Sequence, residues 1–385
     1  MKKLNIHEMD RVLLIVSIIL FVFGLLNIVN ASSQAVVIRY GTTLYNYFNK
    51  QLVSILIGVM FTLIILKIPT KKYYFWGVFS FIIVLGALLY LSLFGTMHQG
   101  SINWIKIGPM TFQPSEAAKP VIILIMALLF EKFCKRLQNP RIEQLEKYNL
   151  IGIILIFGFI FPLIIFLQKD LGTTIIIAVI FGLLFLASPI RREEKFKAIT
   201  LAIIMSLVAI IIIVAKQGTL LTPSQASRFD FKDPCSEYED GGYQICNGFI
   251  AINDGGLFGV GIGESKQISY IPESHTDSVF AIISEEYGFI FCSLIFFLFI
   301  VVLYRIFNLA SRASTIRGKY ICFGVGVYLA LHIIVNLGGL FGSMPLTGVP
   351  LPFLSYGGSF TISFMISLAM VQAVCIETNE EKISI

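Results

Sequence analysis

Long apolar runs recur along most of this chain. A helix that crosses a membrane needs roughly 20 mainly apolar residues, and the 385 residues are 56% hydrophobic and only 14% charged, against about 25% charged in soluble domains. The sequence therefore predicts an all-α polytopic membrane protein with about ten transmembrane helices. We expect the spans near residues 12–31, 51–67, 74–95, 116–131, 149–168, 171–188, 198–216, 277–304, 320–344 and 359–377.

The distribution of Lys and Arg predicts the orientation of these spans. Cytoplasmic connections are enriched in both residues, and with the N-terminus in the cytoplasm 20 of the 29 Lys and Arg residues fall on that side. Both termini are then cytoplasmic, and the large loop of about residues 217–276, between the seventh and eighth helices, is extracellular. The net charge of +6 reflects this bias, so we expect no nucleic-acid partner. The whole chain, 1–385, is expected to form one integral membrane domain.

Four polar segments fall on the predicted extracellular side. They are residues 103–119, 168–173, 217–276 and 345–359. Polar and ionisable groups at membrane depth are costly and usually functional or paired. We therefore expect these segments to form the walls of one site.

The segment QPSEAAK contains an ionisable pair at the start of the fourth span. Pro114 suits the first turn of a helix, with Gln113 near the cap, and Ser115 and Glu116 favour the positive end of the helix dipole. Glu116 and Lys119 are three residues apart, so they can meet on one helix face. The pair could serve function, or it could be a buried ion pair that fixes helix packing; both can hold.

The sequence PESHTD directly precedes the eighth span. Thr276 or Asp277 could simply cap that helix, but a carboxylate at the outer membrane surface also suits a general base that accepts a hydroxyl proton. His275 could act as a base, although a loop histidine without metal-ligand companions usually packs or hydrogen-bonds. Further along, Glu285 and Glu286 need partners, for which Lys119 and Arg228 are candidates.

The glycines and cysteines of the large loop leave alternatives open. In GGLFGVGIG, backbone amides could hold a phosphate, or the glycines could only let the loop fold against helices. The chain has no Walker A lysine loop, so ATP-driven transport is not expected. Cys235 and Cys246 could form a disulfide if the loop is extracellular, whereas the other four cysteines lie in or beside apolar runs and are expected to pack as small hydrophobes.

Five pieces in order resemble the SEDS family, the shape, elongation, division and sporulation proteins that include FtsW, RodA and SpoVE. They are NWIKIGPMTFQPSEAAK, LQKDLGT, GYQ…AINDGGLFGVGIG, YIPESHTDSVFAIISEEYGF and PLTGVPLPFLSYGGS, spread over residues 103–359. The forms PLTGVPLPFLSYGG and ESHTD are more similar to FtsW and SpoVE than to RodA. The chain departs from the family pattern at Lys169, at Phe360, at the two loop cysteines and at Asp254, which adds a second loop carboxylate.

The resemblance implies a peptidoglycan glycosyltransferase that polymerises lipid II on the outer face of the bacterial cytoplasmic membrane. It implies that Asp277 is the catalytic carboxylate and that the family's loop arginine corresponds to Arg228. The matching motifs place the remaining substrate-binding candidates at Gln113, Ser115, Glu116, Lys119, His275, Glu286, Ser355 and Tyr356.

The same resemblance implies partners and a cofactor. We expect a class B penicillin-binding protein, other divisome or elongasome membrane proteins, and a divalent cation, Mg²⁺ or Mn²⁺, whose ligands the sequence does not identify. The alternatives are a lipid II flippase, a different polyprenyl-sugar polymerase or ligase, and a division scaffold. The ionisable residues within the spans gather toward the outer half, which favours surface chemistry over transport.

Overall fold

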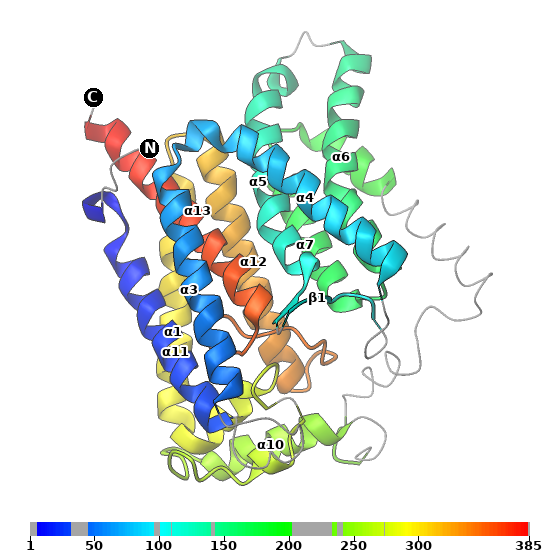
Figure 1. Ribbon diagram of the computed structural model, residues 1–385. Helices are drawn as coiled ribbons and strands as arrows, with labels where there is room; N and C mark the ends of the chain where they lie inside the picture. The colour runs from blue at the N-terminus through cyan, green and yellow to red at the C-terminus, as the bar shows by residue number, and fades with distance from the viewer. Residues whose placement is uncertain are drawn as a thin grey trace, which may run out of the picture.

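The protein is a bundle of long helices, shown as a ribbon in Figure 1. The computed structural model describes residues 6–31, 45–95, 101–108, 110–139, 143–201, 233–236, 242–272 and 274–383. Its long helices are α1 (Arg11–Ala31), α3 (Asn46–Lys67), α4 (Tyr73–Phe94), α5 (Pro114–Gln138), α6 (Gln144–Leu167), α7 (Leu171–Ala187), α11 (Val279–Arg312), α12 (Ile316–Leu340) and α13 (Gly358–Ile383). The short elements are η1 (Ile6–Glu8), η2 (Thr70–Lys72), β1 (Ile105–Ile107), β2 (Met110–Phe112), α10 (Tyr243–Gly255) and η5 (Gln267–Ser269).

These helices confirm a multi-pass membrane protein. Within the described residues, nine of the ten predicted spans coincide with a long helix, and seven helices are long and apolar enough to cross a membrane. Only the first part of the predicted seventh span, 198–216, falls within the described residues, which end at position 201 here. Residues 192–201 form a helix. The division between the fifth and sixth spans is confirmed, because α6 ends at Leu167 and α7 begins at Leu171.

Several predicted boundaries were wrong. α5 begins at Pro114 and runs to Gln138, past the predicted 116–131, because its polar last turns continue the helix beyond the apolar run. α11 runs to Arg312 instead of 304 for the same reason. The connection before α5 is a small antiparallel hairpin of β1 and β2 in a fold expected to be all helical. Gly108, with φ at +60°, makes its turn.

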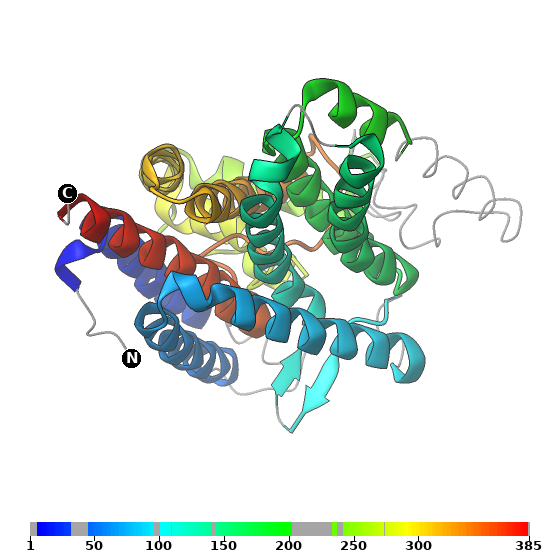
Figure 2. The same ribbon diagram turned by 90° about the horizontal axis from the view of Figure 1, so that it is seen from above.

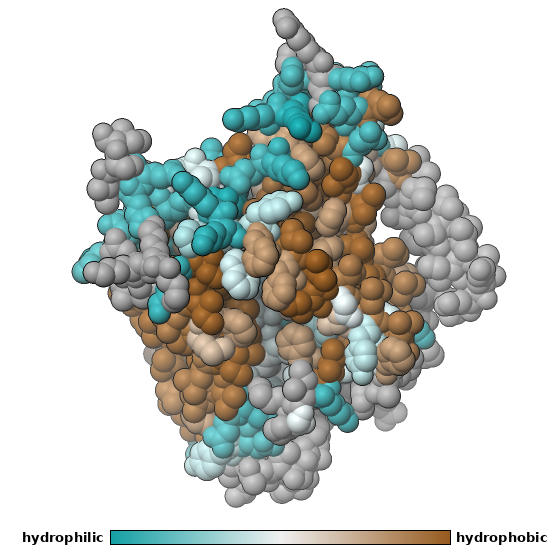
Figure 3. Space-filling model, turned by 45° about the horizontal axis from the view of Figure 1, so that its top comes forward, coloured by the Kyte–Doolittle hydropathy of each residue, from teal (hydrophilic) through white to brown (hydrophobic). Residues whose placement is uncertain are grey.

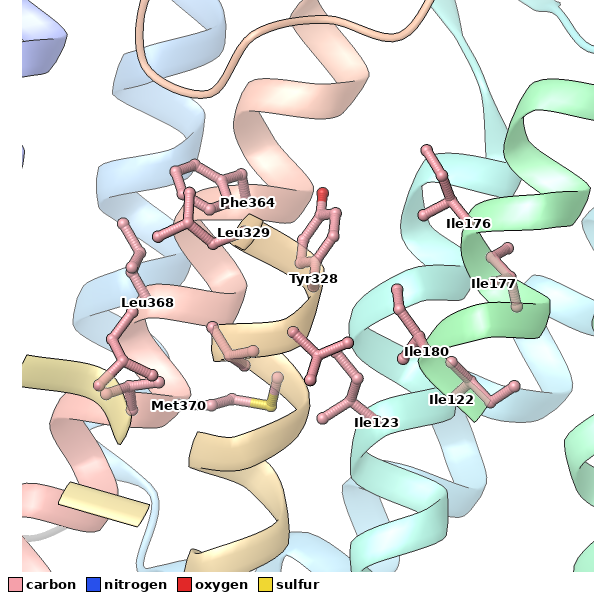
Figure 4. Close-up of a cluster of buried hydrophobic side chains, with 14 of the residues drawn as sticks. Ile122, Ile123, Ile176, Ile177, Ile180, Tyr328, Leu329, Phe364, Leu368 and Met370 are labelled. Atoms are coloured by element: carbon pink, nitrogen blue, oxygen red, sulfur yellow. The ribbon is translucent and has the colours of Figure 1, made fainter. Parts of the chain in front are cut away.

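The core lies where α5, α7, α12 and α13 pack together. Figure 4 shows Ile122 and Ile123 of α5 facing side chains of α7 and α12. Tyr328 of α12 is fully buried at this junction and meets Phe364 of α13 with ring centroids 5.9 Å apart. α13 packs along α3, as the view from above in Figure 2 also shows. Burial of this many apolar side chains fixes the helices that carry the polar site.

The bundle has two polar ends separated by an apolar surface (Figure 3). We call the end where α1 begins and α13 finishes the terminus end, and the end where α5, α7, α11 and α13 begin the site end (Figure 1). At the terminus end, Arg305 of α11 pairs with Asp10 at 2.7 Å. Arg317 of α12 pairs with Glu131 at 3.0 Å and with Glu377 at 3.1 Å. These ion pairs tie helices from distant parts of the sequence together.

Candidate functional site

Asp277 lies at the site end, immediately before α11, and is 8% exposed. Its Oδ1 accepts hydrogen bonds from Gln244 Nε2 of α10 at 3.2 Å and from Thr276 Oγ1 at 3.3 Å. The Gln244 amide also donates to Ser278 Oγ at 2.8 Å. The N-cap position of α11 is Ser278 and not Thr276 or Asp277, so the simple capping interpretation of these two residues was wrong. α10, which lies across the end of the bundle (Figure 1), orients the carboxylate.

Asn336 of α12 fixes the main chain of Asp277. Its Nδ2 donates to the Asp277 carbonyl at 2.7 Å and to the Val349 carbonyl at 2.8 Å. A side-chain amide has two N–H donors, and both are used. This one buried side chain, near the C-terminal end of α12, thereby joins the start of α11 to the connection 345–357.

His275 and Tyr356 form an aromatic wall beside this point. The His275 ring lies 4.2 Å from the Tyr47 ring of α3 and 5.6 Å from the Tyr356 ring, centroid to centroid, and Tyr356 N donates to the His275 carbonyl at 2.9 Å. Burial, with a smaller effect of Tyr47, raises the pKa of Tyr356 to about 12, so its hydroxyl stays protonated. Ser355 Oγ instead accepts from Leu351 N at 2.7 Å and closes the local turn.

Glu116 and Lys119 meet as predicted, and the pair is buried. Lys119 Nζ lies 2.7 and 2.8 Å from the two Glu116 oxygens and 3.1 Å from His332 Nε2 of α12. An ammonium group has three donors, and these contacts use all three. His332 Nε2 is then the acceptor, so its Nδ1 carries the proton and donates to the Pro350 carbonyl at 3.1 Å. Ser115, next to the pair, is buried as well.

The Glu116–Lys119 pair contacts His332, which lies deeper in the bundle than Asn336, the residue of α12 that holds Asp277. His332 and Asn336 are four residues apart on α12, about one helical turn, and their acceptors Pro350 and Val349 are adjacent in the chain. The pair therefore supports the connection that also borders Asp277.

Asp170 and Gln113 together join three of the predicted polar segments. It caps α7 by accepting from Thr173 N at 3.1 Å, and its Oδ2 accepts from Gln113 Nε2 at 3.1 Å and Asn103 Nδ2 at 3.3 Å. Gln113 N donates to Ser359 Oγ at 2.9 Å. The segments 103–119, 168–173 and 345–359 thus meet at the site end, as the sequence predicted.

Glu285 and Glu286 are bound by the loop and not by the candidate Lys119. Glu285 accepts from Ser265 Oγ at 2.5 Å and from Lys266 N at 2.9 Å. Glu286 Oε1 accepts from Gly263 N at 3.0 Å. The expectation that Lys119 pairs with them was wrong because Glu116 lies on the same helix face and reaches Lys119 first. The other candidate, Arg228, lies outside the described residues.

The two loop cysteines form a disulfide. Cys235 and Cys246 are bonded across a sequence separation of 11, while the other four cysteines are free and buried, as expected. Cys246 lies on α10, two residues after Gln244. The bridge therefore tethers the beginning of α10.

The structure adds site residues beyond those that the sequence motifs predict. Gln244 lies in the GYQ motif, so its motif could have identified it. His332 and Asn336 are polar residues in an apolar span, which is itself a signal of function or pairing. Tyr47 carried no such signal. Within the described ranges, no group of three His, Cys, Asp or Glu side chains is placed to hold a metal ion.

The fold and site define a multi-pass membrane protein with a polar cluster at the site end that includes the held carboxylate of Asp277. Residues 10–380 match the family model for the FtsW, RodA and SpoVE cell cycle proteins. The chain is 31% identical over 377 residues to the "Probable peptidoglycan glycosyltransferase FtsW" of Bacillus subtilis, covering 96% of this chain and 91% of that protein. It is 30% identical over 372 residues to the "Peptidoglycan glycosyltransferase MrdB" of Escherichia coli, covering 95% and 93%.

Solved structures share the fold. The RodA crystal structure from Thermus thermophilus aligns with a TM-score of 0.66 at 21% identity, over 95% of this chain and 96% of that one. A chain from a structure described as a peptidoglycan synthase complex aligns with a TM-score of 0.71 at 21% identity, over 96% and 98%. The family model and the two relatives show that the chain belongs to the FtsW/RodA/SpoVE family, the SEDS proteins. It is an enzyme, a glycosyltransferase of that family's peptidoglycan-synthesising class.

Proposed function

We propose that this chain polymerises lipid II with Asp277 as the general base. The observation that carries the proposal is the position of this carboxylate, held by Gln244 through its side chain and by Asn336 through its main chain. Both helices that hold it pack on α11, so the carboxylate has a fixed direction before substrate binds. A base must be positioned within hydrogen-bond reach of the proton it takes.

The reaction is an inverting displacement. The 4-hydroxyl oxygen of the acceptor GlcNAc attacks C1 of the donor MurNAc, and the bond from C1 to the pyrophosphate oxygen breaks. Asp277 takes the proton of the attacking hydroxyl, and undecaprenyl pyrophosphate leaves with the bonding electron pair. One base is sufficient because no covalent enzyme intermediate forms.

Charge on the leaving pyrophosphate needs stabilisation. In this proposal Arg228, the loop arginine that the resemblance to the family implies, takes this role. A divalent cation, Mg²⁺ or Mn²⁺, would supply further neutralisation when bound. Mg²⁺ is commonly held by one or two carboxylates together with substrate phosphates, and because no cluster of three candidate ligand side chains occurs in the described residues, the substrate phosphates would supply much of its donor set. Lys119 and Glu116 support the connection beside Asp277 and do not bind the substrate directly, because Lys119 is 1% exposed and its donors are occupied.

The proposed setting follows the charge distribution. With the positive-inside bias, the terminus end faces the cytoplasm and the site end faces the cell wall. The partners would be a class B penicillin-binding protein, which crosslinks the glycan, and other division or elongation proteins of the bacterial cytoplasmic membrane. The positions of Asp277, His275 and Tyr356 at one end of the bundle favour surface chemistry over lipid II flipping.

The test is polymerisation of purified lipid II by the purified chain in detergent, with and without a class B penicillin-binding protein, and with Mg²⁺ or a chelator. Detergent micelles have no two sides, so transport makes no product there. Glycan chains and free undecaprenyl pyrophosphate support the proposal. Their absence under every condition, for protein that remains folded, contradicts it.

A further inference from the structure

The glycine-rich loop after α10 presents large apolar side chains on the protein surface. Phe258 is 81% exposed, Ile262 64%, Leu257 60% and Val260 43%. Soluble surfaces rarely gather such side chains without a partner. Here all four side chains lie within six consecutive residues, 257–262, of a loop outside the predicted spans.

The loop is firmly built onto α11, so this exposure is a defined surface. α11 is interrupted at Gly288, which has φ +76° and ψ 178°. Next to the break, Phe289 N donates to the Gly256 carbonyl at 2.9 Å and Ile290 N to the Leu257 carbonyl at 3.2 Å. A Cβ on Gly288 would lie 2.3 Å from Gly259 N. The glycines thus let two backbones touch, while the apolar side chains of the loop remain exposed.

The level of the loop follows from the length of α11. Arg305 pairs with Asp10 at the terminus end. A hydrocarbon core of about 30 Å takes roughly 17–25 helical residues, so the unbroken part of α11, from Phe289 to Arg305, places the opposite boundary near the break at Gly288. The loop packs against α11 there, through Val260 N to the Glu285 carbonyl at 2.9 Å.

The apolar surface of the loop continues the lipid-facing surface of α11. Phe289 and Ile290, which bond to the loop, are 66% and 55% exposed, and they belong to a helix that is long and apolar enough to cross a membrane. On either side of the apolar stretch, Asp254 and Glu264 are exposed charged residues. A short apolar stretch with charged flanks at the level of the boundary has the pattern of an interfacial anchor.

We propose that residues 257–262 insert into the bilayer, with Leu257, Phe258, Val260 and Ile262 in contact with lipid acyl chains near the headgroups at the site end. The loop follows α10 directly, so this anchor sets the height of Gln244, and through it of Asp277, above the hydrocarbon. A membrane-bound polyprenyl substrate presents its pyrophosphate at that same level. The anchor itself does not depend on the proposed polymerase chemistry.

Tryptophan quenching by lipid tests the anchor. The parent protein carries Trp76→Phe and Trp104→Phe, and each variant adds one reporter: Phe258→Trp, Ile262→Trp, or the matched control Glu264→Trp on the charged flank. The proteins are placed in bilayers of lipids brominated on the acyl chains and in bilayers of the same lipids without bromine. Substitutions at exposed positions leave the packing intact, and two anchor reporters guard against a single misfolded variant.

The anchor predicts that bromine quenches the Phe258→Trp and Ile262→Trp fluorescence at least about twofold more than that of Glu264→Trp. Equal quenching of anchor reporters and control overturns it. If the surface instead docks another protein, the reporters stay unquenched in bilayers that hold this chain alone, which also overturns it.

Discussion

The side-chain amide of Asn336 donates to the main-chain carbonyl of Asp277 at 2.7 Å. Its second N–H reaches the Val349 carbonyl, so one buried residue of α12 holds both the proposed base and the connection beside it. The base is therefore positioned by its backbone as well as by Gln244. The geometry of the site therefore depends on Asn336, a residue that does not contact the hydroxyl proton which Asp277 is proposed to accept.

Asn336→Leu removes both hydrogen bonds at nearly constant volume. Each buried carbonyl left without a donor costs about 1–3 kcal/mol, and a loss of about 1.4 kcal/mol of transition-state stabilisation lowers a rate tenfold. We expect polymerisation to fall at least about tenfold. The effect should be on kcat more than on KM, because Asn336 positions the base. The control is Asn253→Leu at an exposed position of α10, and equal rates in the two variants would contradict a positioning role.

Lys119→Met leaves the Glu116 carboxylate buried without its cation. Breaking a buried pair in this way costs about 3–5 kcal/mol, whereas replacing both members is often neutral. We expect a clear drop in the thermal unfolding midpoint for Lys119→Met, and recovery in the double variant Glu116→Gln/Lys119→Met. Lys135→Met, at an exposed site on the same helix, should unfold like the wild type. If the Lys119 and Lys135 variants proved equally stable, the pair would not support the fold.

Loss of the disulfide should loosen α10. Closing a loop of 11 residues is worth about 2–3 kcal/mol in the chain-entropy model. A reducing agent should lower the unfolding midpoint of the wild type and leave that of Cys235→Ser/Cys246→Ser unchanged. The four buried free cysteines serve as an internal control, because they are present in both proteins. A reductant effect of the same size in both would assign it to those cysteines instead.

The ionisation of Glu194 should make the stability of the fold depend on pH. Its hydrogen bond with Lys147, 2.9 Å long, lowers the pKa of Glu194 below the ordinary value of 4.5. The carboxylate therefore contributes stability above that ordinary value and loses it as the pH falls through the lowered pKa. The difference in unfolding midpoint between wild type and Glu194→Gln should shrink from pH 7 to below about 4. The control is Glu193→Gln, at the exposed neighbouring residue, whose unfolding midpoint should stay close to that of the wild type at both pH values. If the difference in midpoint between the wild type and Glu194→Gln did not change with pH, the linkage would be refuted.

Local patterns predicted the helices and much of the site. The apolar runs identify the spans, and the spacing of Glu116 and Lys119 identifies their ion pair, because both depend on neighbours in one helix. Motif content also pointed to Asp277. The roles assigned to the substrate-binding candidates remain predictions, and Arg228 lies outside the described residues.

Contacts between distant segments could not be predicted from the sequence. Lys119 meets His332, 213 residues away, and Gln113 meets Asp170, because tertiary packing brings separate helices together. Nor did the glycines of the loop indicate their partner, the broken turn of α11 at Gly288. That partner is defined by backbone approach, which leaves no periodic pattern.

The role of Asp277 is the central claim, and one rate comparison tests it. The initial rate of lipid II polymerisation is measured for Asp277→Asn beside Asp254→Asn, which neutralises an exposed carboxylate elsewhere in the same loop region. An amide cannot take the hydroxyl proton, so we expect Asp277→Asn to lose at least about 10²-fold in rate, while Asp254→Asn stays near the wild type. Near-normal product from Asp277→Asn, in protein that folds as the wild type does, would contradict the account.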